Sequence, residues 1–146
     1  MIVKLDMANA FDRVNLSFLV VVLQRFGFSK KAIDIIKPCI MGPWIAPLVN
    51  GRPSEYFQSL RGLHQGCPLS PFLYIIMADY MSGNLEKCRQ HRTIIGFSIS
   101  PKVKIINHTL FADDSLVMGG ASCIMERRIK KVLNSFMEAS GRLLNN

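Results

Sequence analysis

The chain has 146 residues and a formal charge of +8, and 49% of its residues are hydrophobic. This length fits one domain with a real core, and the apolar content argues against intrinsic disorder. No apolar run approaches the roughly 20 residues of a membrane span, and no basic leader opens the chain, so we expect a soluble, intracellular protein. The charge is compatible with nucleic-acid binding but is spread along the chain and does not establish it. The four cysteines and three histidines lack the spacing of a zinc site.

The first third of the chain predicts one strand and two helices. Residues 1–6 have the pattern of a strand. A helix over residues 16–26 is predicted to begin after Asn15, whose side chain can cap it. A second helix is predicted to begin after Ser29 and to end at Pro38, because proline interrupts the helical hydrogen bonds.

The middle of the chain predicts two strands and a long helix. The strands cover residues 44–50 and 55–60, with a turn at the Asn50-Gly51 pair, although three prolines make this region irregular. Residues 71–89 have the longest apolar helical pattern, and a helix this apolar should lie buried beneath a sheet. The apolar positions of this helix are Phe72, Leu73, Ile76, Met77, Tyr80, Met81 and Leu85.

The last third predicts strands over residues 94–99, 103–110 and 116–118, followed by a helix over residues 122–139. One face of that helix should hold Ile124, Ile129, Val132, Leu133 and Phe136. Short strands covered on one face by helices describe an α+β layer fold.

Two adjacent acidic residues, Asp113 and Asp114, stand in the otherwise apolar stretch from Thr109 to Met118. Neighbouring carboxylates lose hydration in apolar surroundings and repel each other, and a divalent cation relieves both effects. Asp6 ends the opening strand and can supply a third carboxylate. The three carboxylates together would suit a hard metal ion that prefers oxygen ligands. The alternative is structural, because Asp is common in turns and Asp6 could cap a helix.

A second motif runs from Arg61 to Pro71 and combines two glycines with two prolines. Glycines allow a backbone to approach a ligand closely, and a helix that begins after such a loop presents free amides to phosphate. Gln65 offers both a donor and an acceptor to a base or a sugar. Taken alone, the motif could equally be a loop that starts a helix.

Together and in this order, the motifs resemble those of reverse transcriptases, most closely the non-LTR (LINE-type) retrotransposon enzymes. Four groups of residues carry this resemblance, namely Leu5-Asp6 with Ala10 to Val14; Arg61-Gly62, Gln65-Gly66 and Pro68 to Pro71; Phe111 to Asp114; and Phe136 with Ala139 to Gly141 and Asn145. The resemblance implies a polymerase palm-type (ferredoxin-like) antiparallel sheet with helices packed on one face, plus part of the fingers. It also implies that residues 1–146 form a single partial domain, with the front of the fingers and the thumb outside it.

The resemblance further implies that Asp6 and Asp113 bind two Mg²⁺ ions, for which Mn²⁺ could substitute, and that Asp114 completes the catalytic acidic cluster. The backbone carbonyl of Met7 would add a metal ligand. Phe11 would occupy the position that blocks a ribose 2′-hydroxyl, and Gln65 and Gly66 would line the nucleotide site.

The implied activity is RNA-directed DNA polymerisation, with an RNA template, a DNA primer and dNTPs as partners, and with the nucleus as a compartment consistent with the family. Arg61 would contact template phosphate. We expect the isolated chain to polymerise little. Two alternatives stay open: a non-catalytic remnant that at most binds nucleic acid, and an unrelated α+β domain.

Overall fold

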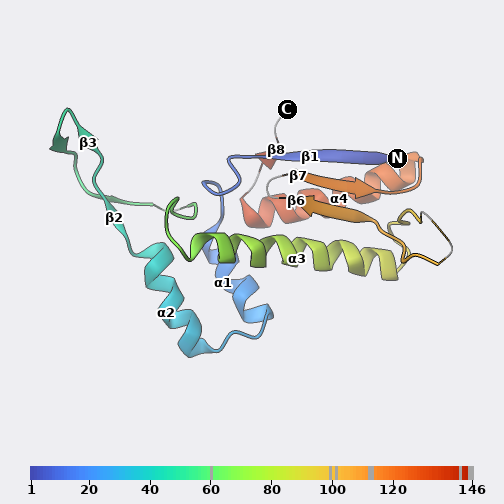
Figure 1. Ribbon diagram of the computed structural model, residues 1–146, viewed down its shortest axis with the longest axis horizontal. Helices are drawn as coiled ribbons and strands as arrows, with labels where there is room; N and C mark the ends of the chain where they lie inside the picture. The colour runs from blue at the N-terminus through green and yellow to red at the C-terminus, as the bar shows by residue number, and fades with distance from the viewer. Residues whose placement is uncertain (60, 99, 101, 112–113, 142, 145–146) are drawn as a thin grey trace.

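The main sheet of the structure has four antiparallel strands. The computed structural model describes every residue except 60, 99, 101, 112–113, 142 and 145–146. The sheet has the strand order β6-β7-β1-β8, and Figure 1 shows it above the long helix α3. Its strands are β1 (Ile2–Ala8), β6 (His108–Phe111), β7 (Asp114–Met118) and β8 (Leu143–Leu144).

The sheet has one buried face and one open face. Along β1, Leu5 and Met7 are buried and Val3 is half-buried, whereas Lys4 and Asp6 are exposed. Because side chains alternate along a strand and match across an antiparallel pair, Asp6 and Asp114 lie on the open face together. The open face is therefore free of the helices, which cover the opposite side.

Three helices pack against one another and share the core on one side of the sheet: α1 (Leu16–Arg25), α3 (Ser70–Gln90) and α4 (Cys123–Ser140). Figure 1 shows α3 and α1 beneath the sheet and α4 behind its strands. Asn15 caps α1 as predicted, since its side chain accepts a hydrogen bond of 3.1 Å from the Phe18 amide. The α+β arrangement with helices on one face is confirmed. Two predicted core positions are wrong, because Phe72 is 65% exposed and Ile124 is 64% exposed. The core residues of this layer include Leu19, Leu23, Leu73, Met77, Leu85, Ile129 and Leu133.

The helix α2 (Lys30–Met41) does not end at Pro38, so that predicted boundary is wrong. Pro38 removes one amide hydrogen from the helix, the one that would bond to the carbonyl of Asp34. Both residues are exposed, so water can satisfy that carbonyl and the helix continues for one more turn. Gly42 then caps the helix, and its amide donates to the Pro38 carbonyl at 3.1 Å.

Residues 44–58, here called the arm, project away from the rest of the molecule (Figure 1). The two predicted strands of this region are replaced by four strands of two residues each. In the arm β2 (Trp44–Ile45) pairs with β5 (Phe57–Gln58), and β3 (Leu48–Val49) pairs with β4 (Arg52–Pro53). The turn predicted at Asn50-Gly51 is present, and both residues have the positive φ that such a tight turn requires.

The predicted strands over residues 94–99 and 103–110 are mostly absent from the described residues. Only a single bridge between Phe97 and Ile106 precedes β6. The start of β6 is instead attached to α3 through Asn107, whose side-chain amide nitrogen donates to the Leu85 carbonyl at 2.6 Å. His108 lies 2.7 Å from the Asn107 amide oxygen through Nδ1 and 2.7 Å from the Ser82 hydroxyl through Nε2. Burial lowers the pKa of His108, which favours the neutral ring in this network.

Within the described ranges, none of the helices combines the length and apolar character needed to cross a membrane.

Candidate active site

Asp6 and Asp114 lie directly opposite each other across the β1–β7 pair. Opposed residues in an antiparallel pair have Cα atoms about 4.5–5.5 Å apart and side chains on the same side. Residues 112–113, which follow β6 in the chain, and with them the predicted catalytic Asp113, fall outside the described residues. The structure thus brings together two of the three predicted carboxylates, one from β1 and one from β7.

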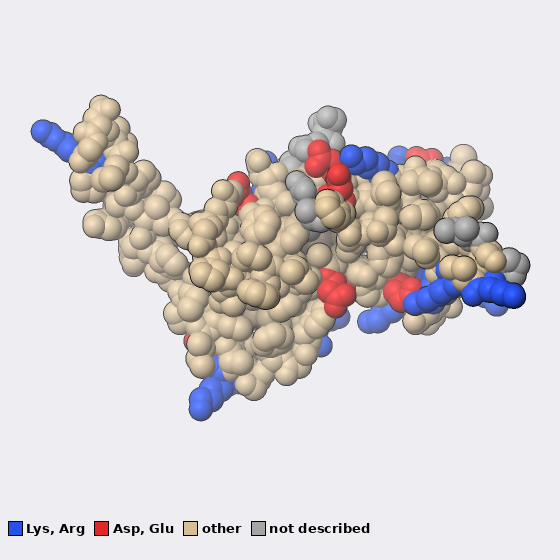
Figure 2. Space-filling model, in the orientation of Figure 1, with Lys and Arg blue, Asp and Glu red and all other residues tan. Residues whose placement is uncertain are grey.

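A lysine accompanies this acidic pair. Lys4 lies two residues before Asp6 on the same face of β1, and its Nζ is 3.2 Å from Asp114 Oδ1. Figure 2 shows acidic side chains at the upper centre of the molecule with a basic side chain beside them. The ion pair is largely exposed to solvent, so it contributes little to stability. Lys4 places a positive charge beside carboxylates that would otherwise repel each other.

The described residues fit a hard cation by donor chemistry but do not complete a site. Carboxylate oxygens at the end of an exposed strand are the ligands that Mg²⁺ prefers, and Asp6 and Asp114 supply them. Over the part of the chain that the structure describes, no group of three or more His, Cys, Asp or Glu residues is placed to hold a metal. The third predicted carboxylate, Asp113, belongs to the residues that are not described.

The loop of the second motif packs against the segment that follows β1. The Gly62 amide donates to the Val14 carbonyl and the Leu63 amide donates to the Phe11 carbonyl, each at 2.9 Å. Gly62 has a φ of +87°, and a Cβ atom there would lie 2.7 Å from the Asp12 carbonyl oxygen. Position 62 therefore requires glycine, both because of the positive φ there and because the two segments approach each other closely.

Two predicted nucleotide-site residues, Phe11 and Gln65, lie on these two packed segments. The Gln65 amide nitrogen donates to Asp12 Oδ1 at 3.0 Å, and both side chains are exposed. Phe11 is half-buried, and its ring stacks on Tyr74 with centroids 4.5 Å apart and planes 8° from parallel. Gly66 also has a φ of +87°, with open space around it. Phe11, Gln65 and Gly66 therefore all lie in or beside the contact between the first and second motifs.

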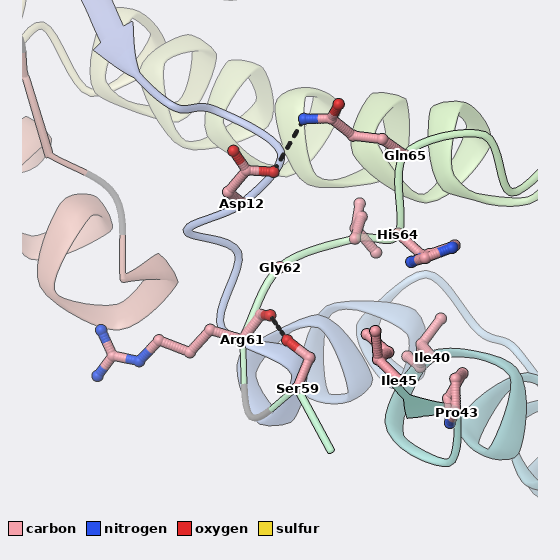
Figure 3. A pocket seen from close by; sticks show the side chains of 10 residues that line it. Asp12, Ile40, Pro43, Ile45, Ser59, Arg61, Gly62, His64 and Gln65 are labelled. Carbon is pink, nitrogen blue, oxygen red and sulfur yellow. Dashed lines mark hydrogen bonds between the residues drawn. The ribbon is translucent and has the colours of Figure 1, made fainter. Parts of the chain in front are cut away.

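A cavity of about 360 Å³ opens between this contact and the base of the arm. Figure 3 shows the hydrogen-bonded Asp12 and Gln65 along one side of the cavity and Ile40, Pro43 and Ile45 along the other. The guanidinium of Arg61 points away from this apolar side (Figure 3). The cavity thus has one polar wall from the two motifs and one apolar wall from α2 and the arm.

The segment after Phe11 also receives the end of α4. The Asn15 amide donates to the Ser140 carbonyl at 2.8 Å. Gly141 caps α4 with a φ of +75°, and a Cβ atom there would lie 2.8 Å from the Arg13 carbonyl oxygen. Beyond it, β8 pairs with β1 through Met7 and Ala8. Residues 11–15 are consequently a shared anchor for parts of the first, second and fourth motifs.

Sequence reasoning gave no role to Lys4, Asp12 or Tyr74. Lys4 could have been noted because it lies two residues before Asp6, and Asp12 because it follows Phe11 directly. Tyr74 gave no such signal, since it lies in a long helix and was not among the apolar positions that the periodicity of this helix marked as buried. Its contact with Phe11 joins positions that are 63 residues apart in sequence, and only the fold reveals it.

Comparisons with known proteins identify the family of the chain. The sequence matches the family described as reverse transcriptase (RNA-dependent DNA polymerase) over residues 1–146. An uncharacterized mitochondrial protein of Arabidopsis thaliana is 38% identical over 68 residues, which are 47% of this chain and 56% of that protein. The Pol polyprotein of the type-1 retrotransposable element R2 of Popillia japonica is 31% identical over 117 residues, which are 80% of this chain and 18% of the polyprotein.

The fold has a solved counterpart. A structure of apo telomerase from Candida tropicalis, truncated from its C-terminal domain, superposes with a TM-score of 0.66 at 15% identity and covers 97% of this chain and 28% of that chain. This likeness confirms the polymerase palm-type fold that the motifs predicted. The chain spans about half or less of the length of the curated relatives named above. The match along its whole length confirms the resemblance, and the chain belongs to the reverse transcriptase family, as a region of the retrotransposon type.

Proposed function

We propose that this chain carries the nucleotidyl-transfer centre of an RNA-directed DNA polymerase. The observation that carries the proposal is the placement of Asp6 opposite Asp114 on the open face, with the Gln65 loop docked on the segment that follows Asp6. Family membership supports the same reaction. The substrates that we infer are a DNA primer, an RNA template and dNTPs.

In this proposal Asp6 and Asp113 hold two Mg²⁺ ions, with the Met7 carbonyl as a further ligand and Asp114 beside them. The bound metal would lower the barrier for attack of the primer 3′-hydroxyl on the α-phosphate and would stabilise the departing pyrophosphate. Phe11 crowds the 2′ position of the incoming sugar and so favours deoxynucleotides. Gln65 offers its amide to the nucleotide once it leaves Asp12, and Arg61 contacts template phosphate.

The test of the proposal is metal binding by the folded chain. Isothermal titration with Mn²⁺ or Mg²⁺ should detect binding that Asp6→Asn and Asp113→Asn weaken by at least about tenfold, because loss of even an outer-shell group commonly costs that much. Asp34→Asn is the matched control, since Asp34 is an exposed carboxylate on α2. If the wild-type chain binds neither metal, the catalytic proposal fails and the non-catalytic alternative is favoured.

Primer extension by the chain alone is expected to remain close to background. A polymerase holds its duplex largely through phosphate contacts, which require cations along the groove. Among the described residues of β1, β6 and β7 on the open face, Lys4 is the single cation, and Asp114 already pairs with it. An oligo(dT)/poly(A) assay with Mg²⁺ measures this, and robust synthesis would contradict the expectation.

A further inference from the structure

We propose that Tyr74 is a positioning residue that holds the Phe11 ring where it discriminates between deoxyribose and ribose. The observation that supports this proposal is the parallel stacking of the two rings, which joins the segment after β1 to the first turns of α3. This inference rests on the proposed function, because Tyr74 is proposed to support Phe11, the residue that would select the sugar.

The contact fixes Phe11 from two directions. At the backbone, the Phe11 carbonyl accepts a hydrogen bond of 2.9 Å from the Leu63 amide. At the side chain, Tyr74 covers one face of the ring with centroids 4.5 Å apart and planes 8° from parallel. Tyr74 is only 6% exposed and belongs to the main core, so it is held in place itself. Phe11 is half-buried and keeps part of its ring accessible to a ligand.

A side chain can exclude one extra hydroxyl only if it cannot move aside. Small displacements of a positioning group have large effects on reactions at an organised site, so the support of such a ring matters as much as its size. Without the Tyr74 ring, Phe11 would keep its backbone hydrogen bond but lose the surface that limits its rotation about χ1 and χ2. The preference for deoxyribonucleotides over ribonucleotides would then be weaker.

The experiment measures nucleotide binding, so it does not depend on polymerisation by the 146-residue chain. Amide chemical shifts in isotope-labelled protein would be followed during titration with dATP and, separately, with ATP, each with Mg²⁺. The wild-type chain should bind dATP more tightly than ATP. Tyr74→Leu should reduce this preference by about two- to tenfold, the range expected for loss of one aromatic pair. Tyr74→Phe keeps the ring and should retain the preference.

A matched control comes from the same helix. Tyr80 makes an edge contact with Phe18 at 5.7 Å, away from Phe11, so Tyr80→Leu should remove an aromatic pair without changing the preference. The amide spectrum also shows whether each variant is folded, and the Phe11 ring signals should lose the ring-current shift from Tyr74 in Tyr74→Leu only.

The outcomes separate this inference from the proposed function. An unchanged preference in folded Tyr74→Leu would overturn the positioning role and leave the proposed function standing. A loss of preference in Tyr74→Phe as large as that in Tyr74→Leu would also overturn it, because the hydroxyl rather than the stack would then be responsible. Absence of binding of either nucleotide to the wild-type chain would overturn the proposed function and this inference with it.

Discussion

Replacing Gly62 with alanine is expected to lower the free energy of unfolding by at least about 2 kcal/mol. A positive φ costs a residue with a side chain about 1–2 kcal/mol, and overpacking typically adds about 1–3 kcal/mol. Both apply here, since Gly62 has a φ of +87° and its Cβ would lie 2.7 Å from the Asp12 carbonyl oxygen. Urea denaturation of both chains, followed by circular dichroism, measures the difference.

Gly27→Ala separates the two causes. Gly27 has a similar φ of +83°, but a Cβ atom at this position would have no neighbouring atom within 4 Å. This variant should therefore show the conformational cost alone, about 1–2 kcal/mol. Equal losses of unfolding free energy in Gly27→Ala and Gly62→Ala would show that the close approach to Asp12 adds no steric cost. The second motif would then pack more loosely on residues 11–15 than the structure indicates.

Replacing Asn107 with leucine is the second change with a large expected effect, a loss of about 2–4 kcal/mol. Leucine has a similar volume but offers no hydrogen bond to the Leu85 carbonyl or to His108 Nδ1, which Asn107 contacts at 2.6 and 2.7 Å. Each buried polar group left without a partner costs about 1–3 kcal/mol. Asn107 is 1% exposed, so water cannot replace the lost bonds without a local opening.

The matched control for this change is Asn134→Leu on the exposed side of α4. Surface substitutions away from special features usually change stability by less than about 0.5 kcal/mol. Chemical denaturation of the two variants should therefore give clearly different midpoints. A loss below about 1 kcal/mol in Asn107→Leu would mean that the link between β6 and α3 depends on packing rather than on this hydrogen-bond network.

The parts of the fold that could be predicted from sequence were those encoded by neighbouring residues. Asn15 caps α1 and the Asn50-Gly51 turn forms, because both depend on short-range geometry. The pairing of Asp6 with Asp114 lies between residues far apart in sequence. The sequence suggested that these carboxylates are close because they stand in otherwise apolar strands, and the order of the motifs supported it. The role of these carboxylates in metal binding stays a prediction.

The remaining features depend on the tertiary environment. Pro38 is tolerated because its end of α2 faces solvent, and periodicity alone cannot report that. Phe72 fits the apolar pattern of α3 but lies on the side that the sheet does not cover. The strand β8 has two residues and no periodicity to detect, so it exists through its pairing with β1. The stack of Phe11 on Tyr74 likewise has no local signal.

The arm has a consequence for the cavity beside Gln65. Its ladders of two residues are too short to be rigid by themselves, and Leu48 and Trp44 are 72% and 64% exposed. One wall of the cavity, made by Asp12, Leu63 and Gln65, is anchored to the core, whereas Pro43 and Ile45 lie where the arm departs from α2. The width of the cavity thus depends on the angle at which the arm leaves Gly42, and a change of that angle would reshape the cavity without altering the pairing of Asp6 with Asp114.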